Sequence, residues 1–211
     1  MDLIKKYIKS LTNLYGQVSV KKVIAIYNEQ NDDQITVDNL QNYFDADMSR
    51  DYVYYYKKHF VHETIMMFNE FRKRRRRKKD KPYYVPEKRE LLKYSDIHYY
   101  EKSKVYHELY NYFLKHFYPD DEENAEMLCQ NIVSECREGL EFENIIAHFN
   151  LIEITFKNKE ELNKILALTV ELSNNLRIWE NNGFTPNEMD KLLRDKPGIF
   201  KRLFQKLFGK R

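Results

Sequence analysis

Residues 162–195 carry the pattern that most constrains the fold of this chain. Apolar side chains recur at three- and four-residue steps, as a helix with one buried face requires. They are Leu162, Ile165, Leu166, Leu168, Leu172, Leu176 and Trp179. This spacing predicts a helix from Leu162 to Glu180 that breaks at residues 181–183, because Gly183 can adopt the left-handed conformation that often ends helices.

A second helix is predicted directly after this break. Thr185 suits the N-cap, Pro186 the first helical position, and Glu188 completes a capping box. Similar periods run along most of the chain, and only 5 Gly and 5 Pro are available for turns. The sequence therefore predicts a mostly α fold.

Residues 1–67 combine a helical period with a strand-like one. Three short helices are expected near residues 3–15, 19–27 and 36–44, the last two capped by Ser19 and Thr36. Aromatic and β-branched runs then predict a β-hairpin, with strands at 52–56 and 60–64 and a turn at 57–59. Three helices followed by a hairpin is the order of a winged helix, so a winged-helix-like unit is predicted.

Eight consecutive cations follow this unit: Arg72, Lys73, Arg74, Arg75, Arg76, Arg77, Lys78 and Lys79. Such a run repels itself and is usually exposed, and Pro82 and Pro86 bound an extended connection after it. Residues 68–86 are therefore predicted to be a basic linker. An irregular multi-helix domain is expected over residues 87–195, and a basic amphipathic tail over residues 196–211.

The charges are segregated along the chain. Residues 1–81 carry a net charge of +6, residues 82–195 carry −9, and residues 196–211 carry +6. Two interpretations follow: the basic segments bind an anionic partner, or they fold back on the acidic body of the same molecule.

The tail has six large apolar residues at helical spacing among Lys, Arg and Gln: Ile199, Phe200, Leu203, Phe204, Leu207 and Phe208. The five other than Ile199 are the predicted partner-binding residues. A segment this short is not helical alone in water, so a surface must order it. That surface is the protein's own groove, a partner protein or an anionic bilayer.

Enzyme signatures are absent from the sequence, which has no phosphate-binding glycine loop, no HExxH, no GxSxG and no CxxC. His59 and His62 lie three apart in a predicted strand and face opposite sides, so no shared metal and no cofactor are expected. Cys129 and Cys136 lie too far apart on one helix to form a disulfide. Reduced thiols and the lack of an N-terminal apolar core favour a cytoplasmic protein, and the missing enzyme signatures favour a non-enzymatic one.

Besides an enzyme of unrecognised type, two functions remain open. The first is a nucleic-acid-binding or regulatory protein that contacts phosphates through residues 72–79, with Lys57 and Lys58 at the hairpin tip, weakly and without sequence preference. The predicted helix at 36–47 carries Asp and no Lys or Arg, so it is unsuited to enter the major groove. The second is a protein-interaction adaptor whose tail docks on a partner or membrane surface.

Three stretches resemble a group of uncharacterised bacterial cytosolic helical proteins: Tyr15–Val18, Lys81–Tyr94 and Asn175–Met189. Members of this group often end in a SEC-C motif, a small cysteine-rich zinc-binding tail. No cysteine follows Cys136 here, so the resemblance does not imply zinc. It implies the division into parts and no biochemical activity.

Overall fold

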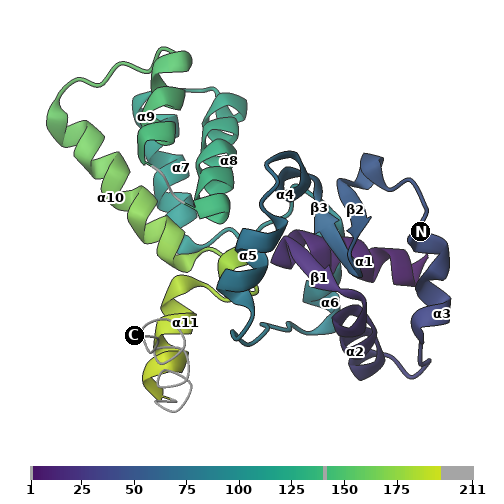
Figure 1. Ribbon diagram of the computed structural model, residues 1–211. Coiled ribbons are helices and arrows are strands. Elements are labelled where there is room, and N and C mark those ends of the chain that lie inside the picture. The colour runs from purple at the N-terminus through teal and green to yellow at the C-terminus, as the bar shows by residue number, and fades with distance from the viewer. Residues whose placement is uncertain (1, 140–141, 196–211) are drawn as a thin grey trace. The chain divides into compact units, whose positions relative to one another are not determined.

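The computed structural model describes residues 2–139 and 142–195. These fall into two compact units (Figure 1). Among the described residues, unit 1 holds residues 2–100 together with Trp179–Gly183, and unit 2 holds the others. Helices account for most of the described residues, which confirms the mostly α class.

Unit 1 combines helices with one small sheet. Its regular elements are α1 (Leu3–Tyr15), β1 (Gln17–Ser19), α2 (Val20–Gln30), α3 (Val37–Leu40), β2 (Val53–Tyr56), β3 (His59–His62), α4 (Glu63–Met67), α5 (Phe71–Lys78) and α6 (Lys88–Leu91). Short 3-10 helices lie at η1 (Gln41–Tyr43), η2 (Ser49–Asp51), η3 (Leu92–Ser95) and η4 (Trp179–Asn181). The strands pair antiparallel in the order β1-β3-β2, and α1 packs against β1 and β3 (Figure 1).

The helices and the hairpin of residues 1–67 form close to their predicted places, and Ser19 caps α2 through its hydroxyl. Strand β1 was not predicted. Its three residues lie between the end of α1 and the start of α2, and Ser19 both ends the strand and caps the next helix. The hairpin turn contains only Lys57 and Lys58, because His59 pairs with Tyr56 across the strands.

The core of unit 1 draws on residues beyond the predicted winged-helix region. Leu91 and Tyr94 are buried in the same cluster as Leu11, Val18 and Phe60. The turn from α6 to η3 therefore belongs to unit 1, whereas the sequence had placed it in a helical domain over residues 87–195. Periodicity identifies the apolar face of a short helix but not the core that the face joins.

The segment Trp179–Gly183 also belongs to unit 1. The Trp179 side chain is 4% exposed, and its Nε1 donates a hydrogen bond to the Asn13 carbonyl oxygen at 2.8 Å. A Cβ on Gly16 would lie 2.6 Å from Trp179 Cδ2, and Gly16 has a φ of +71°, so a glycine is required for this approach.

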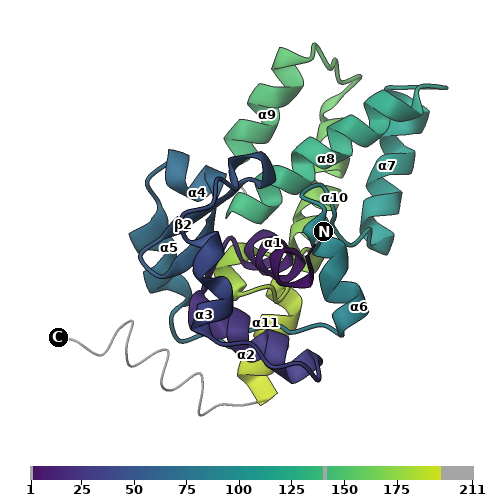
Figure 2. The same ribbon diagram turned by 90° about the vertical axis from the view of Figure 1, so that its right-hand side faces the viewer.

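Unit 2 is a set of packed helices: α7 (Lys104–His116), α8 (Glu122–Gly139), α9 (Phe142–Leu151), α10 (Lys159–Asn175) and α11 (Pro186–Asp195). Helix α10 packs on α7 and α8, α9 on α8, and α11 on α10 (Figure 1 and Figure 2). The helix predicted over Leu162–Glu180 is wrong at both ends. It starts at Lys159, where Asn158 caps it, and it ends at Asn175, because Leu176 is extended with ψ 147°.

The start of α11 follows the predicted capping box. Thr185 Oγ1 accepts the Glu188 N–H at 3.1 Å, and the Glu188 carboxylate accepts the Thr185 N–H at 3.0 Å. Arg177 pairs with that carboxylate and with Glu101, each at 2.8 Å. The two carboxylates raise the pKa of the Arg177 guanidinium against the effect of its burial, so the group stays charged in unit 2.

We expect Trp179→Ala to lower the free energy of unfolding of unit 1 by about 3–5 kcal/mol, because it removes a buried ring and leaves the Asn13 carbonyl without its donor. Trp179→Phe keeps most of the packing and should lower it by roughly 1–3 kcal/mol. Urea titrations followed by circular dichroism measure both values. A loss below about 1 kcal/mol for the alanine variant would show that unit 1 does not need this segment.

Candidate nucleic-acid interface

The run of cations at residues 72–79 is folded, contrary to the expected linker. Residues 71–78 form helix α5, which begins with the buried Phe71. The Phe71 ring makes edge-on contacts with Tyr56 at 5.1 Å and with His59 at 5.3 Å between centroids. Arg and Lys are good helix formers, and the aromatic anchor supplies burial that offsets the repulsion between like charges.

One face of α5 points into unit 1. Phe71, Arg74 and Lys78 lie at three- and four-residue steps, so their side chains share this face. Arg74 bonds Glu70 at 2.5 Å, and its guanidinium lies over the Trp179 ring at 5.5 Å. These contacts remove Arg74 and Lys78 from the set of exposed cations that the sequence predicted.

Lys78 is 5% exposed and has no carboxylate partner among its described hydrogen bonds. Its Nζ donates to the carbonyl oxygens of Tyr15 at 2.5 Å and Gln17 at 3.2 Å. Burial, with a smaller contribution from the nearby charges of Arg74 and Lys81, lowers the pKa of Lys78 to about 7. Lys78 therefore anchors α5 to the chain between α1 and β1.

A second face of α5 is cationic and exposed. Arg72, Arg75, Arg76 and Lys79 follow one another at steps of three, one and three residues, which places them on one side of the helix. They line a shallow hollow of about 550 Å³. Over residues 2–139 and 142–195, none of the four forms an ion pair. Their charges are therefore available to an anionic ligand.

Two further cations of α5 lie at the edges of this face. Lys73 pairs with Glu70 at 3.1 Å, and Arg77 pairs with Glu180 at 3.3 Å. The Lys73 and Arg77 side chains are 55% and 53% exposed, and exposed pairs of this kind contribute little to stability. They can exchange their carboxylate for another anion at small cost.

The hairpin tip adds Lys57 and Lys58, which are both exposed. Their φ values are +48° and +62°, and two positive φ values are the mark of a type I′ turn. Asn-Gly is the usual choice there, because glycine has no Cβ and asparagine tolerates positive φ better than lysine does. The neighbouring His59 contacts Phe71, so the tip lies beside the start of α5. Burial lowers the pKa of His59, so it adds no positive charge at neutral pH.

Helix α3 lacks the features of a base-reading helix, as the sequence indicated. It has four residues, of which Asp38 is charged. Asp45 and Asp47 follow it on exposed positions. Electrostatics therefore favours phosphate contacts at α5 and the hairpin tip over base contacts at α3.

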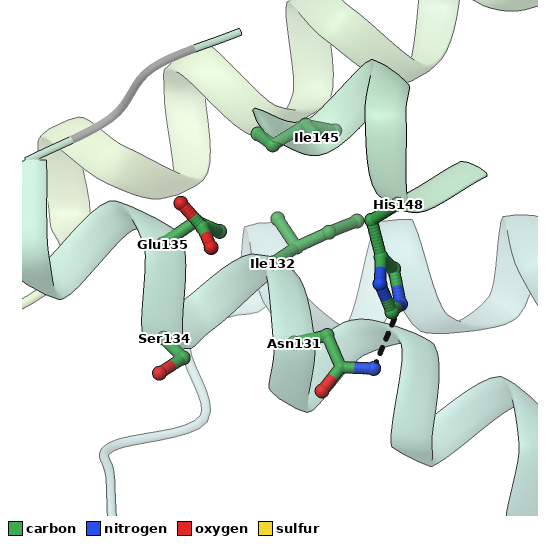
Figure 3. A pocket seen from close by; sticks show the side chains of 6 residues that line it. All are labelled: Asn131, Ile132, Ser134, Glu135, Ile145 and His148. Atoms are coloured by element: carbon green, nitrogen blue, oxygen red, sulfur yellow. Dashed lines mark hydrogen bonds between the residues drawn. The ribbon is translucent and has the colours of Figure 1, made fainter. Parts of the chain in front are cut away.

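Unit 2 contains a small pocket of about 180 Å³ between α8 and α9. Figure 3 shows the His148 ring turned toward the Asn131 amide, and their nitrogen atoms lie 2.9 Å apart. Glu135 also lines the pocket, but its carboxylate accepts a hydrogen bond from Asn144 at 3.1 Å. These residues give no nucleophile and base in contact, so the pocket supports no catalytic assignment.

Several expectations concern residues or groups outside these sites. The predicted partner-binding residues Phe200, Leu203, Phe204, Leu207 and Phe208 lie outside the described residues. Within the described ranges, no three His, Cys, Asp or Glu side chains are grouped so that they could hold a metal ion. In the same ranges, no helix has the length and apolar character needed to cross a membrane.

Comparisons of the chain with protein families, with curated proteins and with solved structures gave no match. The resemblance to the bacterial SEC-C-associated group therefore stays a prediction.

We expect Lys78 to make unit 1 more stable as the pH rises from about 7 to about 10. In this window the unfolded chain keeps the lysine proton, with a pKa near 10.5, while the folded chain has lost it. The free energy of unfolding then rises by up to ~1.4 kcal/mol per pH unit. Lys78→Met should remove this rise. Lys79→Met, which changes the exposed neighbouring lysine, is the control and should keep it. Urea titrations at several pH values test this, and equal slopes for all three proteins would contradict it.

The strained hairpin tip leads to a second expectation. Replacing Lys57→Asn together with Lys58→Gly should raise the free energy of unfolding by about 1–3 kcal/mol, because Asn and Gly adopt positive φ more easily. Lys57→Gln with Lys58→Gln removes the same charges without relieving the backbone and should not stabilise the hairpin. Thermal melting compares the two variants. Equal melting temperatures would show that the turn carries no strain.

Proposed function

We propose that this protein is a non-enzymatic, nucleic-acid-binding or regulatory protein that contacts phosphates through a cationic surface of unit 1. This cationic surface comprises Lys57, Lys58, Arg72, Arg75, Arg76 and Lys79. The observation that carries the proposal is the division of α5 into two faces. The inner cations are buried or paired, whereas the four outer ones are exposed without an ion pair among the described residues.

Phosphates fit this surface better than isolated carboxylates do. A row of cations over seven helical positions spans about 10 Å, which is about three phosphate spacings along a strand. Arginine presents a planar fork that binds phosphate oxygens in pairs, and three of the four outer cations are arginines. Contacts of this kind fix position and supply affinity but do not distinguish bases.

The strained hairpin tip supports the same proposal. A backbone in a sparsely populated conformation persists where something else compensates its cost, and such positions concentrate at functional sites. Lysines at both positive-φ positions place two charges beside the start of α5 at the expense of stability. A polyanion that bridges the tip and α5 accounts for this choice of residues.

The proposal includes a winged-helix-like organisation of the N-terminal part. The order α1-β1-α2-α3-β2-β3 and the strand order β1-β3-β2 support it. In this arrangement the hairpin is the wing, and binding relies on the wing and α5 instead of the short, acidic α3. The resulting affinity is weak at physiological salt and insensitive to sequence.

The test is the salt dependence of binding to duplex DNA. Four to six cations that reach phosphates give a log–log slope of about −4 to −5. Changing Arg72, Arg75, Arg76 and Lys79 together to Gln should flatten the slope by about three to four units, because each lost phosphate contact contributes about 0.9. Fluorescence anisotropy at several salt concentrations measures this.

The matched control changes four exposed lysines of unit 2, Lys157, Lys159, Lys164 and Lys191, to Gln. It removes the same net charge, so a nonspecific charge effect would flatten both slopes equally. Equal flattening in the two variants, or no binding by the native protein at low salt, would overturn the proposal.

A further inference from the structure

The most exposed large apolar side chains described in unit 1 are two neighbours, Met67 and Phe68, at 72% and 68% exposure. Met67 is the last residue of α4, and Phe68 lies in the turn between α4 and α5. Residues on either side of them are buried, with Ile65 at 1% and Phe71 at 4%. The chain therefore turns an aromatic ring to solvent in the middle of a segment that otherwise anchors itself in the core.

The turn that presents Phe68 is fixed by its backbone. The N–H groups of Phe68, Asn69 and Glu70 donate to the carbonyl oxygens of Thr64, Met66 and Ile65, respectively, at 3.0–3.1 Å. Asn69 has a φ of +53°, a conformation that asparagine tolerates better than most residues. An aromatic ring on a hydrogen-bonded turn loses little entropy when a ligand covers it.

Phe68 lies next to the cationic surface in the chain. It precedes Arg72, the first outer cation of α5, by four residues, and α5 itself begins at Phe71. A ligand that covers the ring and also reaches the exposed cations of α5 must accept a row of positive charges. A strand of nucleic acid meets both conditions, because it offers a phosphate chain together with flat, apolar bases.

We propose that Phe68 is a stacking platform for an unpaired base, so that the cationic surface prefers single-stranded nucleic acid over duplex. This inference rests on the proposed function. In a duplex the faces of the bases are covered by their neighbours, and the ring could reach one only after a base had been unstacked. In a single strand the base faces are accessible, and phosphate contacts along α5 hold the strand in reach of the ring.

An anionic bilayer is the competing occupant of an apolar tip beside a basic helix. It is less well supported, because an interfacial helix buries a continuous apolar face. The outward face of α5 consists of Arg72, Arg75, Arg76 and Lys79 and carries no apolar side chain. Only the tip itself would enter the lipid.

The experiment compares fluorescein-labelled oligodeoxythymidine with a hairpin duplex by anisotropy, using the full chain. Phe68→Ala should weaken single-strand binding by roughly five- to a hundred-fold, the range found for one base–aromatic stack, and should leave the salt slope unchanged. Duplex binding should change less than about two-fold. Phe68→Trp should keep the affinity, and its added fluorescence should be quenched by the single strand. Leu151→Ala, which removes a 79% exposed side chain in unit 2, is the control.

The outcomes separate the two proposals. If no oligonucleotide binds the native protein, both fail. If the four-cation variant of α5 loses binding while Phe68→Ala matches the native protein on single strands, only the stacking inference fails. If Phe68→Ala instead reduces binding to phosphatidylserine-containing vesicles and leaves oligonucleotide binding unchanged, the ring serves a membrane surface and the inference is overturned.

Discussion

The contact between Trp179 and the turn at Gly16 is the interaction on which unit 1 depends. It joins residues more than 160 positions apart, and the indole N–H satisfies the buried carbonyl of Asn13. The same segment continues into Asn182, whose side-chain amide donates to the carbonyl oxygens of Lys78 and Lys81 at 3.1 and 2.9 Å. The end of α5 is thus capped by residues from the far end of the chain. The position of the cationic surface is therefore a consequence of this long-range packing.

A buried lysine in this arrangement has a clear physical cost. Lys78 gives up its hydration for two carbonyl oxygens, and the nearby cations oppose its charge, so burial lowers its pKa to about 7. The gain is geometric, since a lysine whose Nζ reaches Tyr15 and Gln17 fixes the rotation of α5 about its axis. Phe71 and Lys78 are turned inward, whereas Arg72, Arg75, Arg76 and Lys79 are exposed on a neighbouring side of the helix. One anchored lysine therefore orients the other cations.

The sequence predicted the parts of this molecule that depend on local rules. The cap at Ser19, the capping box of Thr185 and Glu188, and the hairpin all form, because neighbouring residues decide them. The periodicity places Trp179 in a helix that breaks at residues 181–183, since nothing local shows that Trp179 packs near Gly16. Charge repulsion alone predicts a linker over residues 68–86, because it leaves out the burial of Phe71 that holds α5 on the core. Once residues 71–78 are known to be helical, the sequence shows that Phe71, Arg74 and Lys78 share one side of the helix. Without that knowledge, the sequence does not separate these inner residues from the four exposed cations.

The cationic surface is also a source of local instability that the fold does not remove. On the outer face of α5, Arg72 and Arg76 are separated by four positions, as are Arg75 and Lys79, and like charges at this spacing destabilise a helix by about 0.2–0.5 kcal/mol per pair. The two lysines of the hairpin tip add backbone strain. A polyanion on this surface would relieve the repulsion in addition to making its own contacts, so its binding would strengthen α5. Features that weaken the free protein at one place are thus the same features that would favour an anionic ligand there.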